Sequence, residues 1–398
     1  MFHAKLQRIA KDKLSGAGYT IHITAAWLDS TLIIKIIFNF KQNEMDKKER
    51  IIIIVSIIVT ALAGTLYYMH VNAVIGFIVT AAALALLAMI VGDATEQLGS
   101  RFGPGATGIL QSALGNLPEL FVAIFALRAG LDKVVQAALI GSILGNSLLV
   151  FGLALFVGGL KNGTQKFISE PPKMIATLMI LAFAALAIPS LTNQLHTSAA
   201  SHMNAMDIYV AVVLLILFVA STYFFLKGDK TVVAADSGVK ETHSSSWSLG
   251  LTLFVLTAAG AGAAFVSDWF VEMLQPAMKE LGINDVFAGL VIVAIAGNAI
   301  ENFVGIQLAY RNQPDYAVSV IMNSSLQIAL GLFPLLVLLS FFLGGAILSF
   351  VLSPMLLVSL ALAVIVSAFV VFDGESIWLE GLALIGLYCL IAAAFWWG

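Results

Sequence analysis

Long apolar stretches separated by short polar connections make up the chain from Arg50 onward. Most are about 20 residues or longer and rich in Leu, Ile, Ala and Val, which is the length that a helix needs to cross a bilayer. They lack the ten-residue alternation of an outer-membrane barrel. We count eleven stretches, near 50–70, 72–97, 105–127, 132–158, 173–192, 206–226, 248–271, 286–310, 314–343, 347–372 and 377–397. The pattern predicts an all-α polytopic membrane protein with about 11 transmembrane helices.

The longest polar connection after Arg50 divides these helices into two groups. It contains Asp229, Gly238 and three consecutive serines and is typical of a flexible linker. The predicted organisation is an N-terminal extension at 1–49, a leading helix at 50–71, a first five-helix repeat at 72–226, a cytosolic linker at 227–247 and a second five-helix repeat at 248–398.

Residues 1–44 do not match the rest of the chain. Their only apolar piece, Thr31–Phe40, is interrupted by Lys35 and is too short to span a bilayer. It also lacks the small-residue cleavage site of a signal peptide. Met45 precedes a charged segment and an isoleucine run, as a natural start would, so our hypothesis is that 1–44 is an upstream extension that is not native. The alternative is a cytosolic amphipathic arm.

We predict that a chain starting at Met45 is fully active, because the residues before it contain no predicted span and match nothing in the repeats. Transport by the truncated chain, compared with the full chain at equal membrane abundance, checks this. Loss of insertion or of activity on removing 1–44 would show that these residues matter.

Lysine and arginine residues indicate the orientation. If the first helix starts in the cytoplasm, eleven Lys and Arg residues after Met45 lie on the cytoplasmic side and three on the other side, as the positive-inside rule requires. The inside set is Lys47, Lys48, Arg50, Arg101, Lys161, Lys166, Lys173, Lys227, Lys230, Lys240 and Arg311, and the outside set is Arg128, Lys133 and Lys279. We therefore predict a multi-pass protein of the cell membrane with a cytoplasmic N-terminus and an extracytoplasmic C-terminus. Since each repeat has five helices, the two repeats have inverted topology, as in many secondary transporters.

Composition supports this class and excludes others. The chain of 398 residues is 60% hydrophobic and 11% charged, with a mean hydropathy of +0.99, a balance that soluble domains do not have. Its single cysteine, Cys389, excludes an intramolecular disulfide and a multi-cysteine metal site. There is no basic stripe of the kind that binds nucleic acid. The lipid bilayer is the expected surrounding, and a homo-oligomer is left open.

Two glutamates interrupt apolar stretches at matching places. Glu119 ends the segment Gly115–Glu119 and Glu301 ends Gly297–Glu301, and the two glutamates are 182 positions apart, like the asparagines Asn116 and Asn298. A carboxylate at membrane depth costs about 2.5–3.5 kcal/mol on insertion scales, so it indicates function. The glycines favour close helix approach or a helix break, and Pro118 weakens the helix before it.

The next helices along the chain add more oxygen atoms. Gly141–Asn146 corresponds to Asn323–Ile328, and Ser142 and Ser324 are again 182 apart. Carboxylate, amide and hydroxyl oxygens select hard cations such as Ca²⁺. We therefore predict an ion-binding and exchange site at Glu119 and Glu301, supported by a polar pathway formed by Asn116, Asn298, Ser142, Asn146, Ser324, Ser325 and Gln327. Each amide or hydroxyl taken singly also fits a structural contact between helices.

These motifs carry a resemblance to a known family. Gly115–Leu120 and Gly297–Glu301 resemble the two signature repeats of the Ca²⁺/cation antiporter superfamily, above all its Ca²⁺/H⁺ exchanger (CAX) family. Gly141–Asn146 and Ser324–Ala329 resemble the companion segments, and the likeness covers about 50–398.

The resemblance implies that Glu119 and Glu301 are the exchange site and that Asn116, Asn298, Ser142, Ser324 and Gln327 line the pathway. It also implies transported Ca²⁺ and H⁺ and no cofactor. Two positions depart from the pattern of that family: Asn302 stands where a His is usual, and Pro118 is typical of the Na⁺-coupled branch. A Na⁺- or K⁺-coupled exchanger therefore remains an alternative. An intramembrane hydrolase is the alternative from another class, but the sequence has neither a His-Glu-x-x-His nor a Gly-x-Ser-x-Gly motif.

The predicted mechanism is competition for one site. Two carboxylates in a medium of low dielectric constant neutralise one Ca²⁺, and once the cation leaves they cannot both stay charged. Protons then replace the cation. This competition couples the two fluxes during alternating access at the midplane between the repeats.

Overall fold

A computed structural model describes residues 45–69, 72–101, 110, 114–227 and 247–397, with the backbone alone for 226–227 and 299–302. The chain divides into two units, Met1–Lys47 and Lys48–Gly398, and the second unit contains the repeats and the candidate site.

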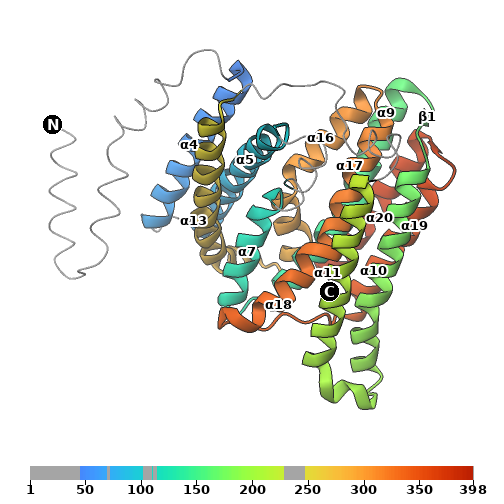
Figure 1. The fold of residues 1–398 in the computed structure, drawn as a ribbon. Helices are drawn as coiled ribbons and strands as arrows, with labels where there is room; N and C mark the ends of the chain where they lie inside the picture. Colours follow the sequence, from blue (N-terminus) through green and yellow to red (C-terminus); the bar gives the residue numbers. More distant parts are fainter. Residues whose placement is uncertain (1–44, 70–71, 102–109, 111–113, 228–246, 398) are drawn as a thin grey trace, which may run out of the picture. The chain divides into compact units, whose positions relative to one another are not determined.

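Helices make up almost all of this unit (Figure 1). The first part contains α4 (Lys47–Tyr68), α5 (Ala73–Gly99), α7 (Leu117–Arg128), α8 (Asp132–Leu144), η1 (Gly145–Val150), α9 (Phe151–Asn162), α10 (Glu170–Gln194), η2 (Ser198–His202) and α11 (Met203–Lys227). The second contains α13 (Leu249–Leu281), α14 (Asp285–Phe287), η3 (Ala288–Val293), α15 (Ala294–Gly297), α16 (Ala299–Tyr310), α17 (Pro314–Gln327), η4 (Ile328–Leu332), α18 (Phe333–Leu343), α19 (Pro354–Val371) and α20 (Trp378–Trp397). Within the described residues nine continuous helical segments are long and apolar enough to cross a membrane. The predicted fold class, an all-α polytopic membrane protein, is confirmed.

The sequence repeat is also a structural repeat. Helix α7 runs from 117 to 128 and α16 from 299 to 310, so both bounds shift by 182. Helices α8 and α17 begin at 132 and 314, and α5 and α13 end at 99 and 281, with the same shift. The π-helical segments η1 and η4 both end 182 positions apart as well, at 150 and 332. The two halves therefore share one backbone plan.

Two of the eleven predicted spans are interrupted at their motifs within the described residues. In the eighth, α15 ends at Gly297 and α16 begins at Ala299, while Asn298 leaves the helical conformation with φ −95° and ψ 18°. In the third, Gly115 and Asn116 form a turn before α7 begins. Neither span is counted among the nine continuous segments. The two parts of the eighth are each too short to cross a membrane, and most of the third before Gly115 lies outside the described residues.

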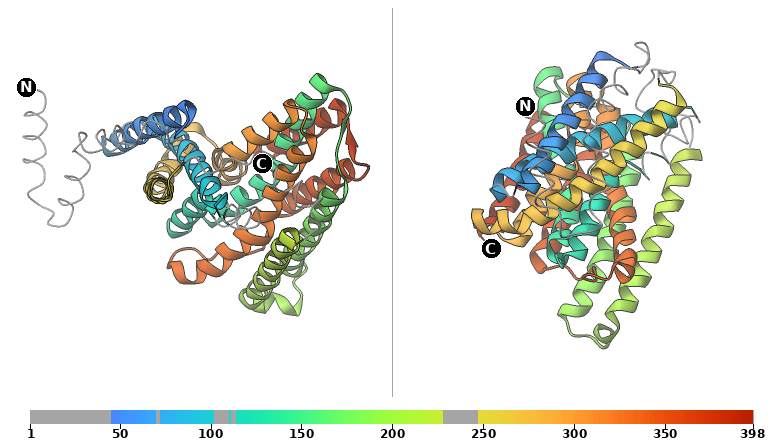
Figure 2. Two further views of the ribbon diagram at one scale, coloured as in Figure 1. Left: turned by 45° about the horizontal axis from the view of Figure 1, so that its top comes forward. Right: turned by 90° about the vertical axis from the view of Figure 1, so that its left-hand side faces the viewer.

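Close contacts between the halves hold the fold together. Helices α5 and α13 lie side by side, as the different views agree (Figures 1 and 2), and Phe77 stacks on Phe270 with ring centroids 4.9 Å apart. Helix α8 packs against η3, where a side chain at Gly141 would collide with the Leu290 backbone. The strands β1 (Gln165–Lys166) and β2 (Glu375–Ser376) pair antiparallel and tie two connections together. A small residue such as Gly141, where two helices approach closely, is typical of helix packing in membranes.

The tenth predicted span starts later than the sequence indicates. It was expected from residue 347, but α19 begins at Pro354, with Ser353 as its N-cap. The seventh runs further than predicted, since α13 reaches Leu281. In front of α19, residues 345–353 lie in irregular backbone, which is tolerated at such a place where other groups satisfy its hydrogen bonds.

Buried polar side chains from three other helices bind this irregular segment. Asp207 of α11 accepts from the Phe350 N–H at 3.2 Å, and Ser190 of α10 accepts from the Leu352 N–H at 2.9 Å. Gln136 of α8 donates to the Ser349 carbonyl at 2.7 Å. Asp207, only 1% exposed, is thus a structural carboxylate.

We expect Asp207→Ala to lower the free energy of unfolding by about 1–3 kcal/mol, because it leaves the buried Phe350 N–H without its acceptor. Asp207→Asn keeps a side-chain oxygen and is the matched control. Thermal unfolding of both variants in detergent measures the difference. Equal stability of the Ala variant and the native chain would contradict this role.

Candidate functional site

Both motifs lie at helix beginnings. Asn116 is the N-cap residue of α7 and Asn298 that of α16, and neither side chain caps its helix. Glu119 lies in the first turn of α7, and Pro118 fits there because a first-turn residue needs no N–H acceptor. The amino end of a helix carries a partial positive charge, which favours a carboxylate in the first turn.

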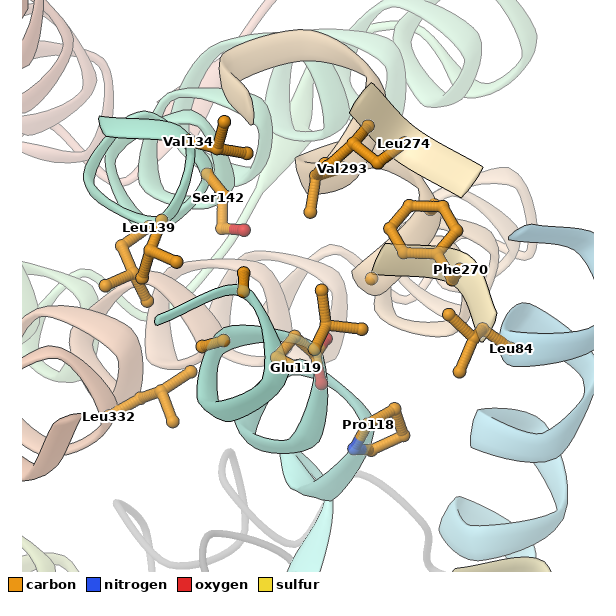
Figure 3. Close-up of a pocket in the computed structure, with 17 residues that line it drawn as sticks. Leu84, Pro118, Glu119, Val134, Leu139, Ser142, Phe270, Leu274, Val293 and Leu332 are labelled. Carbon is orange, nitrogen blue, oxygen red and sulfur yellow. The ribbon is translucent and has the colours of Figure 1, made fainter. Parts of the chain in front are cut away.

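The first motif glutamate contacts the second motif. A methyl group added at Gly297 would lie 3.0 Å from Cγ of Glu119 and 3.3 Å from Oε1, so the Glu119 side chain rests against the bare backbone at Gly297. Both residues line a cavity of about 40 Å³, which is large enough for a few water-sized groups. Figure 3 shows Glu119 of α7 and Ser142 of α8 facing this space among apolar side chains that include Leu84, Phe270 and Val293.

Asparagine and serine side chains form a buried network across the repeat boundary. Asn146 donates to the side-chain oxygen of Asn298 at 3.3 Å and to the hydroxyl of Ser324 at 2.9 Å. Asn298 donates in turn to the hydroxyl of Ser142 at 2.7 Å and to the carbonyl of Ala294 at 2.9 Å. The pairs Asn146–Asn298, Asn146–Ser324 and Asn298–Ser142 each join one repeat to the other.

Two further pairs complete the set. Asn116 donates to the side-chain oxygen of Gln327 at 3.4 Å, and the hydroxyls of Ser147 and Ser325 are 3.0 Å apart. Among the residues that the structure describes, Oδ1 of Asn116 and Oδ1 of Asn146 are buried without a hydrogen-bond partner. Buried acceptors left without a donor are costly, and a bound cation would satisfy them.

The predicted residues thus come together, except that the position of the Glu301 side chain is not described. The structure brings Glu119 of the first repeat against Gly297 of the second, and the predicted amides and hydroxyls meet in cross-repeat pairs. The side chain of Glu301 lies outside the described residues, although Glu301 belongs to the first turn of α16. Carboxylate, amide and hydroxyl oxygens suit a hard cation as cargo.

Sequence reasoning missed Ser147. It pairs with Ser325, yet their counterparts 182 positions away are Ala329 and Ile143, so the repeat signal does not mark this pair. The π-helical segments were missed as well. Such segments occur often at functional sites, and here η1 contains Asn146 and Ser147.

We expect Gly297→Ala to reduce transport at least tenfold while leaving the protein folded. Its methyl group would lie 3.0 Å from Cγ of Glu119 and push this side chain away from its position, while Ala suits a helix better than Gly. Gly386→Ala in α20, where nothing lies within 4 Å of the added group, is the control. Cation uptake into proteoliposomes measures both, and native uptake by Gly297→Ala would contradict the contact.

Two repeated helical halves whose motifs meet in a buried polar network are typical of secondary transporters. The sequence profile described as "sodium/calcium exchanger protein" matches residues 72–227 and 251–397. The chain belongs to this family.

Relatives and a solved structure agree. The chain is 35% identical over 331 residues to the Ca(2+)/H(+) antiporter ChaA of Bacillus subtilis (strain 168), covering 82% of this chain and 93% of the relative. It is 33% identical over 346 residues to a Ca(2+)/H(+) antiporter of Aphanothece halophytica, covering 83% and 92%. The structure of native YfkE superposes with a TM-score of 0.74 at 32% identity, covering 87% of this chain and all of the other.

Proposed function

We propose that this chain is a secondary active transporter that exchanges Ca²⁺ for H⁺ at Glu119 and Glu301. The observation that carries the proposal is the meeting of the two motifs at the repeat boundary, where Glu119 rests against Gly297. The surrounding oxygen atoms suit Ca²⁺. The names of the relatives, Ca(2+)/H(+) antiporters, support both the cargo and the coupling ion.

The proposed cycle uses one set of oxygen atoms for both ions. With both carboxylates charged, the site neutralises one Ca²⁺, assisted by the amide oxygens of Asn116 and Asn146. When the site faces the other side, protons displace the cation. An empty site with two uncompensated charges in an apolar cavity reorients unfavourably, which limits leak.

Proton coupling is favoured over the Na⁺- or K⁺-coupled alternative because the matched relatives are named for H⁺ exchange. The departures at Pro118 and Asn302 are compatible with this. Membership of an exchanger family likewise favours transport over the hydrolase alternative.

The proposed location is the cell membrane, with the N-terminus in the cytoplasm. The contacts between connections fit one alternating arrangement: Arg101 donates to the Trp247 carbonyl, and β1 pairs with β2, among connections that the charge pattern places inside. On the side predicted to be outside, Asn284 donates to the Phe395 carbonyl and Asn72 to Glu280.

Uptake into proteoliposomes tests the function. Vesicles with an acidic interior should accumulate Ca²⁺ from a medium of higher pH, and collapse of the gradient with a protonophore should stop it. Equal vesicles carrying an outward Na⁺ or K⁺ gradient without a pH difference are the controls. Uptake driven by Na⁺ or K⁺ and indifferent to the pH gradient would overturn proton coupling.

A further inference from the structure

The two motif helices, α7 and α16, end in the same type of turn. Gly130 after α7 and Asn312 after α16 both have left-handed backbone, with φ of 81° and 61°. Their N–H groups donate to the carbonyls of Leu127 and Ala309 at 3.0 and 3.1 Å, positions that are 182 apart. This turn is a common helix ending and results from the duplicated plan.

Each of these carbonyls accepts a further hydrogen bond from the opposite repeat. The Leu127 carbonyl accepts from the backbone N–H of Ala346 at 2.8 Å. The Ala309 carbonyl accepts instead from two side chains of the first repeat, Nδ2 of Asn162 at 3.1 Å and Nε2 of Gln165 at 3.4 Å. Both half-helices are thus anchored across the repeat boundary, one by backbone and the other by side chains.

The ammonium group of Lys161 also binds the carboxyl end of α16. Nζ of Lys161 donates to the Tyr310 carbonyl at 3.1 Å and lies 3.4 Å from the centroid of the Tyr310 ring. A positive charge at the carboxyl end of a helix is favourable, as is a cation over an aromatic face. We call Lys161, Asn162 and Gln165 the α16 anchor.

The anchor is not a product of the duplication. The residues 182 positions after Lys161, Asn162 and Gln165 are Leu, Gly and Ile, none with a side-chain donor. Gln165 is only 2% exposed and presses against the backbone at Gly158, while its Oε1 has no partner among the described residues. A buried amide satisfied on one side only is costly, so its donor side serves a specific purpose.

The contacts at the carboxyl end of α16 bear on the orientation of the whole helix. The helix has only 12 residues, and Asn298 separates it from α15 without a side-chain cap. Residue 301 is eight positions before Ala309, or about 12 Å along the axis. A short helix that is detached at its first residue takes its direction from its packing and from its anchored last turn.

We propose that Lys161, Asn162 and Gln165 are positioning residues that align the Glu301 half-helix for transport. The inference rests on the proposed exchange function. It predicts that loss of the anchor slows turnover without weakening the site itself, because no anchor residue belongs to the polar network of the site.

The double variant Asn162→Leu/Gln165→Met tests it, since it removes both side-chain donors to Ala309 at nearly constant volume. We expect the maximal rate to fall about five- to tenfold, as for one or two lost hydrogen bonds, while KM and the equilibrium Ca²⁺ affinity stay within about twofold. Asn162→Gln, which keeps an amide donor, should retain most of the rate. Thr164→Val and Lys166→Met alter the same connection and serve as controls, because neither side chain makes a hydrogen bond to α16 among the described residues; Lys166 pairs with Glu375 instead.

A folded double variant with native maximal rate overturns the proposal, and so does a fall shared equally by the two controls. If the double variant does not fold, Lys161→Met decides, because Lys161 is exposed: an unchanged rate overturns the proposal and a reduced rate with unchanged affinity supports it. The native chain is measured alongside with H⁺, Na⁺ and K⁺ gradients. Should Na⁺ drive the native chain, the proposed coupling fails, and the anchor is judged by the same rates with Na⁺.

Discussion

Glu119→Gln and Glu301→Gln should each reduce Ca²⁺/H⁺ exchange at least a hundredfold. Gln has nearly the same volume and keeps one oxygen, but it carries no charge and takes up no proton. A site with one carboxylate leaves half of the charge of Ca²⁺ uncompensated. In an apolar surrounding the attraction between Ca²⁺ and a carboxylate is stronger than in water, so its loss weakens binding more. The variant also has one proton fewer to exchange.

The measurement is uptake into proteoliposomes under a pH gradient, with size-exclusion and thermal unfolding profiles to show that the variants fold. Glu380→Gln in the first turn of α20 is the matched control. Among the described residues its carboxylate accepts only from the Ile377 N–H, which an amide oxygen can also do. Near-native exchange by either motif variant would refute the assignment of that glutamate.

Much of the fold could be predicted because long apolar runs in the sequence indicate membrane helices. The repeat could be predicted because two carboxylates that are costly to bury in a membrane occur at matching positions, 182 residues apart. The breaks at Asn116 and Asn298 were foreseen only as an option, from Gly115, Gly297 and Pro118. A helix that breaks at the site keeps an apolar composition, so hydropathy alone does not distinguish it from a continuous span.

The contacts that were missed depend on the tertiary structure. Ser147 and Ser325 have apolar counterparts in the opposite repeat, and Asp207 serves an irregular segment that the hydropathy pattern assigns to a helix. In each case the partner is more than 140 positions away. The predicted network was recoverable because its members, such as Ser142 and Ser324, keep the spacing of the duplication.

Raising the pH should tighten Ca²⁺ binding, and the steepness should report the number of protons displaced. At low pH protons occupy the carboxyl groups, and Ca²⁺ binding must release them. If both glutamates are protonated in the free protein and both lose their protons to the cation, the apparent affinity rises by up to about a hundredfold per pH unit. The rise ends once the free site is already deprotonated.

The single variants make this dependence specific to the site. Glu119→Gln leaves one titrating carboxyl group, so the remaining Ca²⁺ affinity should rise by at most about tenfold per pH unit. Residue 302 is Asn, which does not titrate, so a steep dependence near neutral pH comes from the two glutamates rather than from a histidine beside them. Calcium titrations of the solubilised chain across about pH 5–9 measure both slopes. A flat profile for the native chain, with binding that Na⁺ weakens instead, would show that Na⁺ rather than H⁺ competes with Ca²⁺ for these oxygen atoms.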